Sequence, residues 1–151
     1  MSETGRFGQK NMTINEIQNR IINEMASFEE WFDKYEYLIE QGKKLKPLND
    51  DFKIEENLIK GCQSSVWVHA DTNGVSGGKI HFGADSDTLI TRGMIALLLK
   101  VLNNRAPREI LDADLYFIQE TGLSSNLSPS RANGLNSIAK QMKQLAKDLN
   151  G

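Results

Sequence analysis

The sequence predicts an α+β fold in which a small antiparallel sheet of about three strands packs against helices. Three observations lead to this prediction. Apolar residues recur at steps of three and four near both ends of the chain, which is typical of amphipathic helices. Two short alternating segments with an Asn-Gly pair between them occupy the middle, as in a β-hairpin. A nearly uninterrupted apolar stretch follows them, and a helix that is apolar on all sides belongs in the centre of a domain.

Length and composition indicate a single domain. The chain has 151 residues, and a net charge of −2 gives it no basic field that would attract nucleic acid. It has no apolar run of membrane-spanning length, and its first residues do not resemble a secretory signal, so we expect a cytoplasmic location. Residues 1–12 are polar and aperiodic and are expected to be a disordered leader to a domain over 13–151.

Two helices are expected before the sheet. Thr13 and Glu16 fit a capping box, in which a hydroxyl and a carboxylate accept from free backbone amides at a helix start. Ser27 and Glu30 fit a second one, which predicts a new helix that ends at Gly42. Residues 43–57 are expected to form a loop. The buried face of the second helix is predicted to consist of Phe28, Trp31, Phe32, Tyr35, Leu38 and Ile39.

The hairpin and the central helix follow. Residues 66–71 and 80–84 alternate as strands should, and residues 57–60 are expected to add a short third strand. The segment Asp85-Ser86-Asp87 offers an N-cap for a buried helix over about 87–103.

Three helical segments are expected after the central helix. Pro107 suits the first turn of a short helix, and residues 114–121 are expected to form another. Ser128 as N-cap and Pro129 at the first position begin the last helix, which continues to the end of the chain.

Cys62, the only cysteine, is the main candidate for chemistry. A single thiol cannot close an intramolecular disulfide or build a zinc or iron–sulfur site, so no metal is expected. Gly61 lets the backbone bend just before it, and the polar Gln63 and Ser64 after it are unusual neighbours for a core residue. A reactive thiol is therefore favoured over a buried inert one. The cation of Lys60 and the amides after Cys62 could lower its pKa.

Three other side chains allow functional interpretations. His69 and His81 lie in the predicted strands and could pair across the hairpin, although ordinary strand residues are the simpler interpretation. Arg131 lies near the start of the last helix, where the helix dipole disfavours a cation. We expect it to pair with a carboxylate or to orient a loop.

Three separated segments resemble the signature of the SufE family of sulfur acceptors. They run from Gly61 to Trp67, from Asp85 to Ala96 and from Ser128 to Leu135, and the aromatic region from Trp31 to Tyr35 also agrees. The resemblance extends over about residues 15–149, and its specificity comes from three motifs in the same order and spacing.

The resemblance implies a fold shared with iron–sulfur scaffold proteins of the IscU type. It implies that Cys62 accepts a sulfane sulfur from a SufS-type cysteine desulfurase, becomes a persulfide, stimulates that enzyme and relays sulfur to a downstream iron–sulfur scaffold. The PLP cofactor belongs to the desulfurase, and this chain is expected to need none. The candidate residues of the cysteine loop and the partner surface are Gly61, Gln63, Ser64, Asp87 and Arg131.

Two alternatives remain open from the sequence. The first is an independent cysteine hydrolase in which Cys62 works with His69 or His81 as base. The second is an adaptor that activates a desulfurase allosterically and carries no sulfur.

Overall fold

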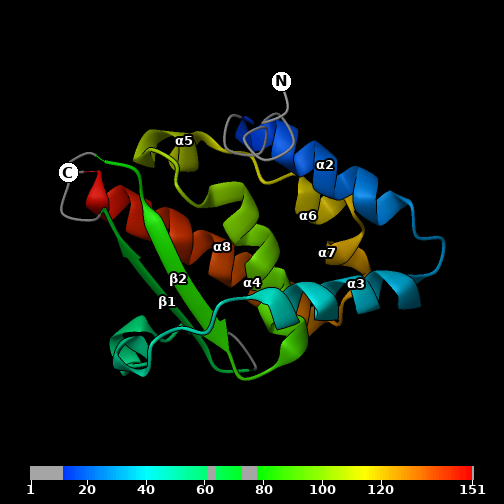
Figure 1. Cartoon of the computed structure of the whole chain (residues 1–151), viewed down its shortest axis with the longest axis horizontal. Helices are drawn as coiled ribbons and strands as arrows, with labels where there is room; N and C mark the ends of the chain where they lie inside the picture. The colour runs from blue at the N-terminus through cyan, green and yellow to red at the C-terminus, as the bar shows by residue number, and fades with distance from the viewer. Residues whose placement is uncertain (1–11, 61–63, 73–77, 151) are drawn as a thin grey trace.

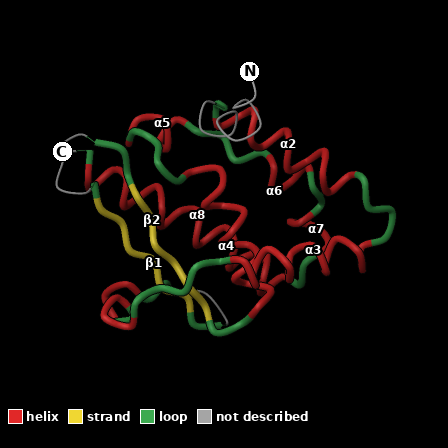
Figure 2. The backbone as a smooth tube through the Cα atoms, viewed as in Figure 1, coloured by secondary structure: helices red, strands yellow, loops and turns green. Residues whose placement is uncertain are grey.

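The structure is a computed structural model that describes residues 12–60, 64–72 and 78–150 (Figures 1 and 2). Its helices are α2 (Ile14–Ala26), α3 (Trp31–Lys44), α4 (Leu89–Leu102), α5 (Pro107–Asp112), α6 (Phe117–Glu120), α7 (Leu123–Asn126) and α8 (Pro129–Leu149). Two short 3₁₀ turns, η1 (Asp50–Phe52) and η2 (Glu55–Asn57), precede the strands β1 (Val66–Asp71) and β2 (His81–Ser86). The order of helices, hairpin and further helices confirms the predicted α+β class.

In the described part of the chain the sheet has two strands, fewer than the roughly three that were predicted. β1 and β2 pair antiparallel, from Val66 opposite Ser86 to Asp71 opposite His81. Residues 57–60 contribute only an isolated bridge, because the chain enters this pairing from η2 and leaves it again after Ile59. Ile80, expected in the second strand, forms an isolated bridge with Arg105 instead. The Asn-Gly turn of the hairpin lies outside the described residues.

The hydrophobic core lies on one face of the hairpin. Figure 1 shows α4 beside the two strands, and α4 packs against β2 while α8 packs against β1. Nine of the 14 residues of α4 are buried, which confirms the predicted central helix. η1 and η2 contact β1 away from these helices, so the segment between α3 and β1 lies over the outer face of the hairpin.

Helix α3 crosses α4 at a pair of glycines. A Cβ atom on Gly42 would lie 2.4 Å from the carbonyl oxygen of Leu89, and one on Gly93 would lie 2.1 Å from that of Leu38. Gly42 was predicted to end the helix, but α3 continues to Lys44. This glycine is therefore needed for the close approach of two helices and is not a C-terminal stop.

The helix starts were predicted with mixed success. Thr13 and Glu16 form the expected capping box. Ser27 does not cap a helix start: its hydroxyl donates to the carbonyl oxygen of Glu24 at the end of α2, and α3 begins after Glu30 without a side-chain cap. At the start of α4 the N-cap is Thr88 and not a residue of the segment 85–87, since β2 continues to Ser86.

Phe32 is predicted on the buried face of α3 but is 69% exposed. It lies six residues before the fully buried Leu38, which places it about 120° away around the helix.

The remaining helices follow the prediction more closely. α5 begins at Pro107, and Ser128 caps α8 by accepting a hydrogen bond from the backbone amide of Arg131. The helix expected over 114–121 is the shorter α6, and α7 was not predicted.

The expected leader falls outside the described residues except for Met12. Met12 packs half-buried against the core, and its carbonyl oxygen accepts a hydrogen bond from Arg105. Among the described residues, no helix combines the length and the apolar character needed to cross a membrane.

Candidate functional site

Cys62, Gly61 and Gln63 lie outside the described residues, but the chain on both sides of them is well defined. The backbone amide of Ile59 donates to the carbonyl oxygen of Val66 at 2.8 Å, and Leu58 bridges Trp67 in antiparallel fashion. Residues 60–65 therefore connect two paired positions, and Cys62 belongs to this connection. Its three undescribed residues, 61–63, are called the cysteine segment.

Ser64 is held at the first turn of α4. Its hydroxyl oxygen lies 3.1 Å from that of Thr91, and the Thr91 hydroxyl accepts a second hydrogen bond from Thr88 at 2.7 Å. Thr91 is only 3% exposed, so this hydroxyl group needs such partners. The contact fixes the chain at the point where it emerges from the cysteine segment.

Asp87 holds the next residue. Its carboxylate accepts a hydrogen bond from the amide of Ser65 at 3.1 Å, and its own amide donates to the carbonyl oxygen of Ser65 at 3.3 Å. The side chain is otherwise exposed, apart from a long contact of 3.5 Å with the Ser86 hydroxyl. Asp87, one of the candidate loop residues, thus lies directly beside the cysteine segment.

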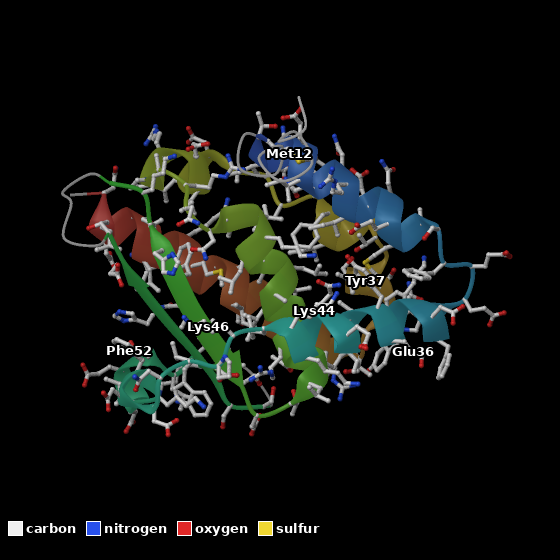
Figure 3. The ribbon with its side chains drawn as sticks, in the orientation of Figure 1. Met12, Glu36, Tyr37, Lys44, Lys46 and Phe52 are labelled. Carbon is white, nitrogen blue, oxygen red and sulfur yellow. The ribbon has the colours of Figure 1, made fainter. Side chains whose placement is uncertain are left out.

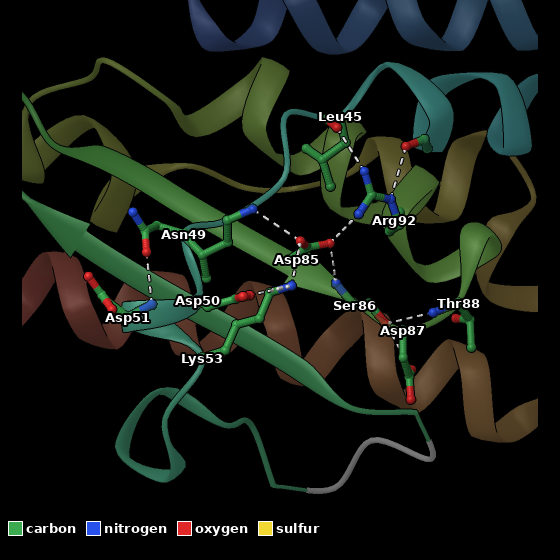
Figure 4. Close-up of polar contacts among 12 residues, drawn as sticks. Leu45, Asn49, Asp50, Asp51, Lys53, Asp85, Ser86, Asp87, Thr88 and Arg92 are labelled. Carbon is green, nitrogen blue, oxygen red and sulfur yellow. Dashed lines mark hydrogen bonds and ion pairs between the residues drawn. The ribbon is translucent and has the colours of Figure 1, made fainter.

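A buried carboxylate lies two residues before Asp87, as Figure 4 shows. Asp85 is 1% exposed and accepts hydrogen bonds from the backbone amides of Leu48 at 3.0 Å and Ser86 at 2.8 Å. It also forms ion pairs with Arg92 and, at 3.4 Å, with Lys53.

Arg92 extends this network to α3 by donating to the carbonyl oxygens of Gly42 and Leu45. Burial by itself raises the pKa of Asp85. The amides of Leu48 and Ser86, followed by the charges of Arg92 and Lys53, outweigh this effect and leave the pKa below its usual value. The network therefore joins α3, the loop before the cysteine segment, β2 and α4 through one ionised group.

Sequence reasoning missed both the Thr88–Thr91 pair and the role of Asp85. Asp85 was interpreted only as part of a helix cap. A useful signal was present in Arg92, a cation within an otherwise apolar helix, because a buried cation requires an acidic partner. For the two threonines no comparable signal exists, since hydroxyl residues are common near helix starts.

Arg131 lies apart from this cluster. It is exposed in the first turn of α8, and its guanidinium donates to the phenol oxygen of Tyr35 on α3. Within the described residues Arg131 forms no ion pair with a carboxylate, and no hydrogen bond links it to Ser64 or Asp87. Its expected role in orienting a loop stays a prediction.

The two histidines do not pair across the hairpin. The register sets His69 opposite Gly83 and His81 opposite Asp71. The ring of His69 stacks on Phe52 at 4.1 Å, and its Nε2 lies 3.7 Å from the Asp71 carboxylate. His81 contacts the side chain of Asn104 through Nδ1 at 3.3 Å. Both rings are thus engaged in contacts of their own on the half of the hairpin away from Ser64.

The described ranges contain no group of three or more His, Cys, Asp or Glu side chains that could hold a metal ion. The described polar groups next to the cysteine segment include the hydroxyls of Ser64, Thr88 and Thr91, the exposed carboxylate of Asp87 and the exposed Lys60.

Comparison with known proteins identifies the family of this chain. Residues 19–146 match the family described as "SufE: Fe-S metabolism associated domain". The chain is 37% identical over 129 residues to the cysteine desulfuration protein SufE of Wigglesworthia glossinidia brevipalpis, covering 85% of this chain and 88% of that protein. It is 42% identical over 113 residues to a SufE-like protein of Synechocystis, covering 75% and 69% of the two chains.

A solution structure of a hypothetical protein from Thermus thermophilus shows the same fold. Its TM-score is 0.71 at 21% identity, over 88% of this chain and 95% of that one. The family match and the two relatives confirm what the three sequence motifs indicated. The chain belongs to the SufE family, whose domain is associated with iron–sulfur metabolism.

Proposed function

We propose that this protein accepts sulfur on Cys62 from a SufS-type, PLP-dependent cysteine desulfurase, stimulates that enzyme and relays the sulfur to an iron–sulfur scaffold. The family match and the relative named as a cysteine desulfuration protein support a role in this area of metabolism. We assign residues 13–151 to the acceptor domain. A thiol that has to stay reduced between cycles suits a cytoplasmic location.

The observation that carries the proposal is the attachment of Ser64 and Ser65 at the start of α4. Ser64 and Ser65 follow Cys62 in the sequence by two and three residues, and both are held at the start of α4. The N-cap Thr88 makes no side-chain capping hydrogen bond, which leaves the amides of the first turn without that partner. Backbone amides at a helix start and the helix dipole stabilise negative charge, and a thiol carries that charge when it acts as a nucleophile.

The proposed step is a thiol exchange. The Cys62 thiolate attacks the terminal sulfur of the persulfide on the desulfurase. A new S–S bond forms at Cys62 as the S–S bond of the donor breaks, and the donor cysteine leaves as a thiolate. No electrons are gained or lost overall, so the step needs no oxidant, reductant or resident cofactor.

Ser64, Asp87 and Arg131 are the candidates for the cysteine loop and the partner surface that the structure describes, and the side chains of Asp87 and Arg131 are exposed. We propose that Asp87 positions the cysteine segment through Ser65, and that Arg131 contacts the desulfurase from α8. Arg131→Ala should lower the rate of desulfurase-dependent transfer with little change in stability. Lys140→Ala, at an exposed position on the same helix, is the matched control and should leave the rate unchanged.

The experiment that tests the function is mass spectrometry of the whole protein after incubation with a desulfurase, PLP and free cysteine. We expect the wild type to gain the mass of one sulfur atom, reversibly with a reductant, and Cys62→Ser to gain none. Wild-type protein that stays unmodified while the desulfurase turns over would contradict the proposal.

The same samples discriminate the alternatives. A hydrolase would turn over substrate without the desulfurase, and its activity would depend on His69 or His81. A pure adaptor would stimulate the desulfurase fully as Cys62→Ala, whereas a sulfur acceptor loses the part of the stimulation that depends on transfer.

A further inference from the structure

A long groove lies on a part of the surface that the proposed sulfur chemistry does not use. Its volume is about 1050 Å³, and its walls come from the end of α3, the following loop, strands β1 and β2 and the second half of α4. Figure 3 shows Lys44, Lys46 and Phe52 along this side of the molecule, from α3 to η1. Ser64, Asp87 and Arg131 do not line it.

Apolar side chains contribute much of the groove lining. Leu45, Leu48, Phe82 and Leu99 all line it, and Leu45 and Phe82 belong to the hydrophobic core. The volume lies just above the usual range for small-molecule pockets, about 300–1,000 Å³. A groove of this volume with an apolar lining suits several residues of a peptide better than it suits a small metabolite.

The charges on the walls are unevenly compensated. The two carboxylates already have cationic or polar partners, since Asp50 pairs with Lys53 at 3.5 Å and Asp71 lies 3.7 Å from His69. Lys44 and Lys46 also line the groove, and within the described part of the chain neither forms an ion pair. The groove therefore presents positive charge without a partner.

Lys100 adds to this imbalance from the side of α4. It is half-buried, and burial lowers its pKa. The carboxylate of Glu24 opposes this shift, and the like charges of Lys44 and Arg20 add to it. A carboxylate brought into the groove would stabilise the charged form of this lysine as well as those of its neighbours.

We propose that this groove binds an acidic, partly apolar peptide segment of a partner protein. Apolar side chains of the segment occupy the space over Leu48 and Leu99, and its carboxylates pair with Lys44, Lys46 and Lys100. This inference does not depend on Cys62, so the proposed function and the groove can succeed or fail separately.

The probe is a fluorophore-labelled synthetic peptide of alternating leucine and glutamate, measured by fluorescence anisotropy with the full-length protein. We expect binding that weakens with salt, and about tenfold or more weaker binding of the peptide in which glutamine replaces glutamate. Amide signals of Leu45, Phe82 and Leu99 should shift in NMR spectra when the glutamate peptide is added.

Charge reversal tests the lysines directly. Lys44→Glu combined with Lys46→Glu should weaken peptide binding about tenfold or more. The matched control is Lys140→Glu combined with Lys147→Glu on α8, which changes net charge equally and should leave binding unchanged. Lys46→Glu alone, in an exposed loop, tests the proposal without involving a helix residue.

Several outcomes would overturn the inference. Equal affinity for the glutamine peptide would mean that the acidic requirement is wrong, and no binding of either peptide would mean that the groove is not a peptide site. Displacement of the peptide by a single-stranded oligonucleotide would indicate nucleic acid as the occupant. Self-association in sedimentation experiments that Lys46→Glu abolishes would indicate a second copy of this chain.

Discussion

Replacing Asp85 with alanine should destabilise the fold strongly, because the carboxylate has four partners and almost no access to water. It accepts from two backbone amides, those of Leu48 and Ser86, and it pairs with Arg92 and Lys53. Alanine leaves the amides without their acceptor and the guanidinium without its counter-charge.

The size of the effect follows from the burial of each partner. Removing one member of a buried ion pair costs about 3–5 kcal/mol. Arg92 keeps two carbonyl acceptors and is 18% exposed, and Lys53 is 29% exposed, so both cations can recover some hydration. We therefore expect about 3 kcal/mol, the lower end of that range.

Urea unfolding followed by fluorescence of Trp31 and Trp67 measures this loss. With the m-values usual for small domains, the midpoint should fall by about 1 M or more. Asp87→Ala is the matched control, because it removes a carboxylate only two residues away that is exposed and accepts one short hydrogen bond. Its midpoint should change little, although its sulfur transfer should slow if the proposed role is correct.

The pH dependence gives an independent check with a fixed sign. The pKa of Asp85 is lower in the folded protein, so the unfolded chain binds the proton more readily. The stabilisation is complete above the unfolded-state pKa of about 3.9 and disappears as pH falls through the lower folded-state pKa. Asp85→Asn should flatten this part of the acid unfolding curve. An alanine variant that loses less than about 1 kcal/mol, well below the cost of breaking a buried pair, would refute this reasoning.

Three further changes test other parts of the structure. Thr13→Ala should cost about 0.5–2 kcal/mol in urea unfolding because it removes a real capping hydroxyl, whereas Ser27→Ala, at a similar motif that caps no helix start, should cost clearly less. Gly93→Ala should lower the melting temperature, because its methyl group would overlap the backbone of Leu38 and force α3 away from α4. His69→Ala should leave desulfurase-dependent sulfur transfer unchanged in the mass-spectrometric assay, and a large loss would favour the hydrolase.

Signals that act within a few residues predicted much of the fold. The capping box at Thr13, the apolar character of residues 89–102 and the Ser128-Pro129 start all correspond to elements of the structure. Each depends on hydrogen bonds or side-chain periodicity within one helix, so the sequence contains all the information required.

The errors concern contacts between distant segments. Gly42 has the character of a helix stop, and only the position of α4 shows that it is a crossing point. Ser27-Phe28-Glu29-Glu30 satisfies the capping pattern, yet the Ser27 hydroxyl is used at the end of the preceding helix. The prediction of a third strand was wrong for a similar reason. Residues 57–60 follow the 3₁₀ turn η2 directly, so they pair with β1 only through the isolated bridge at Leu58.

The candidate site combines both kinds of information. The motif around Cys62 was visible in the sequence, but the partners of Ser64 and Ser65 are 27 and 22 residues away and become neighbours only because β2 runs back along β1 into α4. Asp85 holds the point where β2 passes into α4, and it also ties down the loop that leads to the cysteine segment. Both flanks of that segment therefore depend on one buried carboxylate. A variant of Asp85 that still folds should for this reason lose sulfur transfer more readily than a variant equally destabilised elsewhere, such as Thr13→Ala combined with a second change in α2.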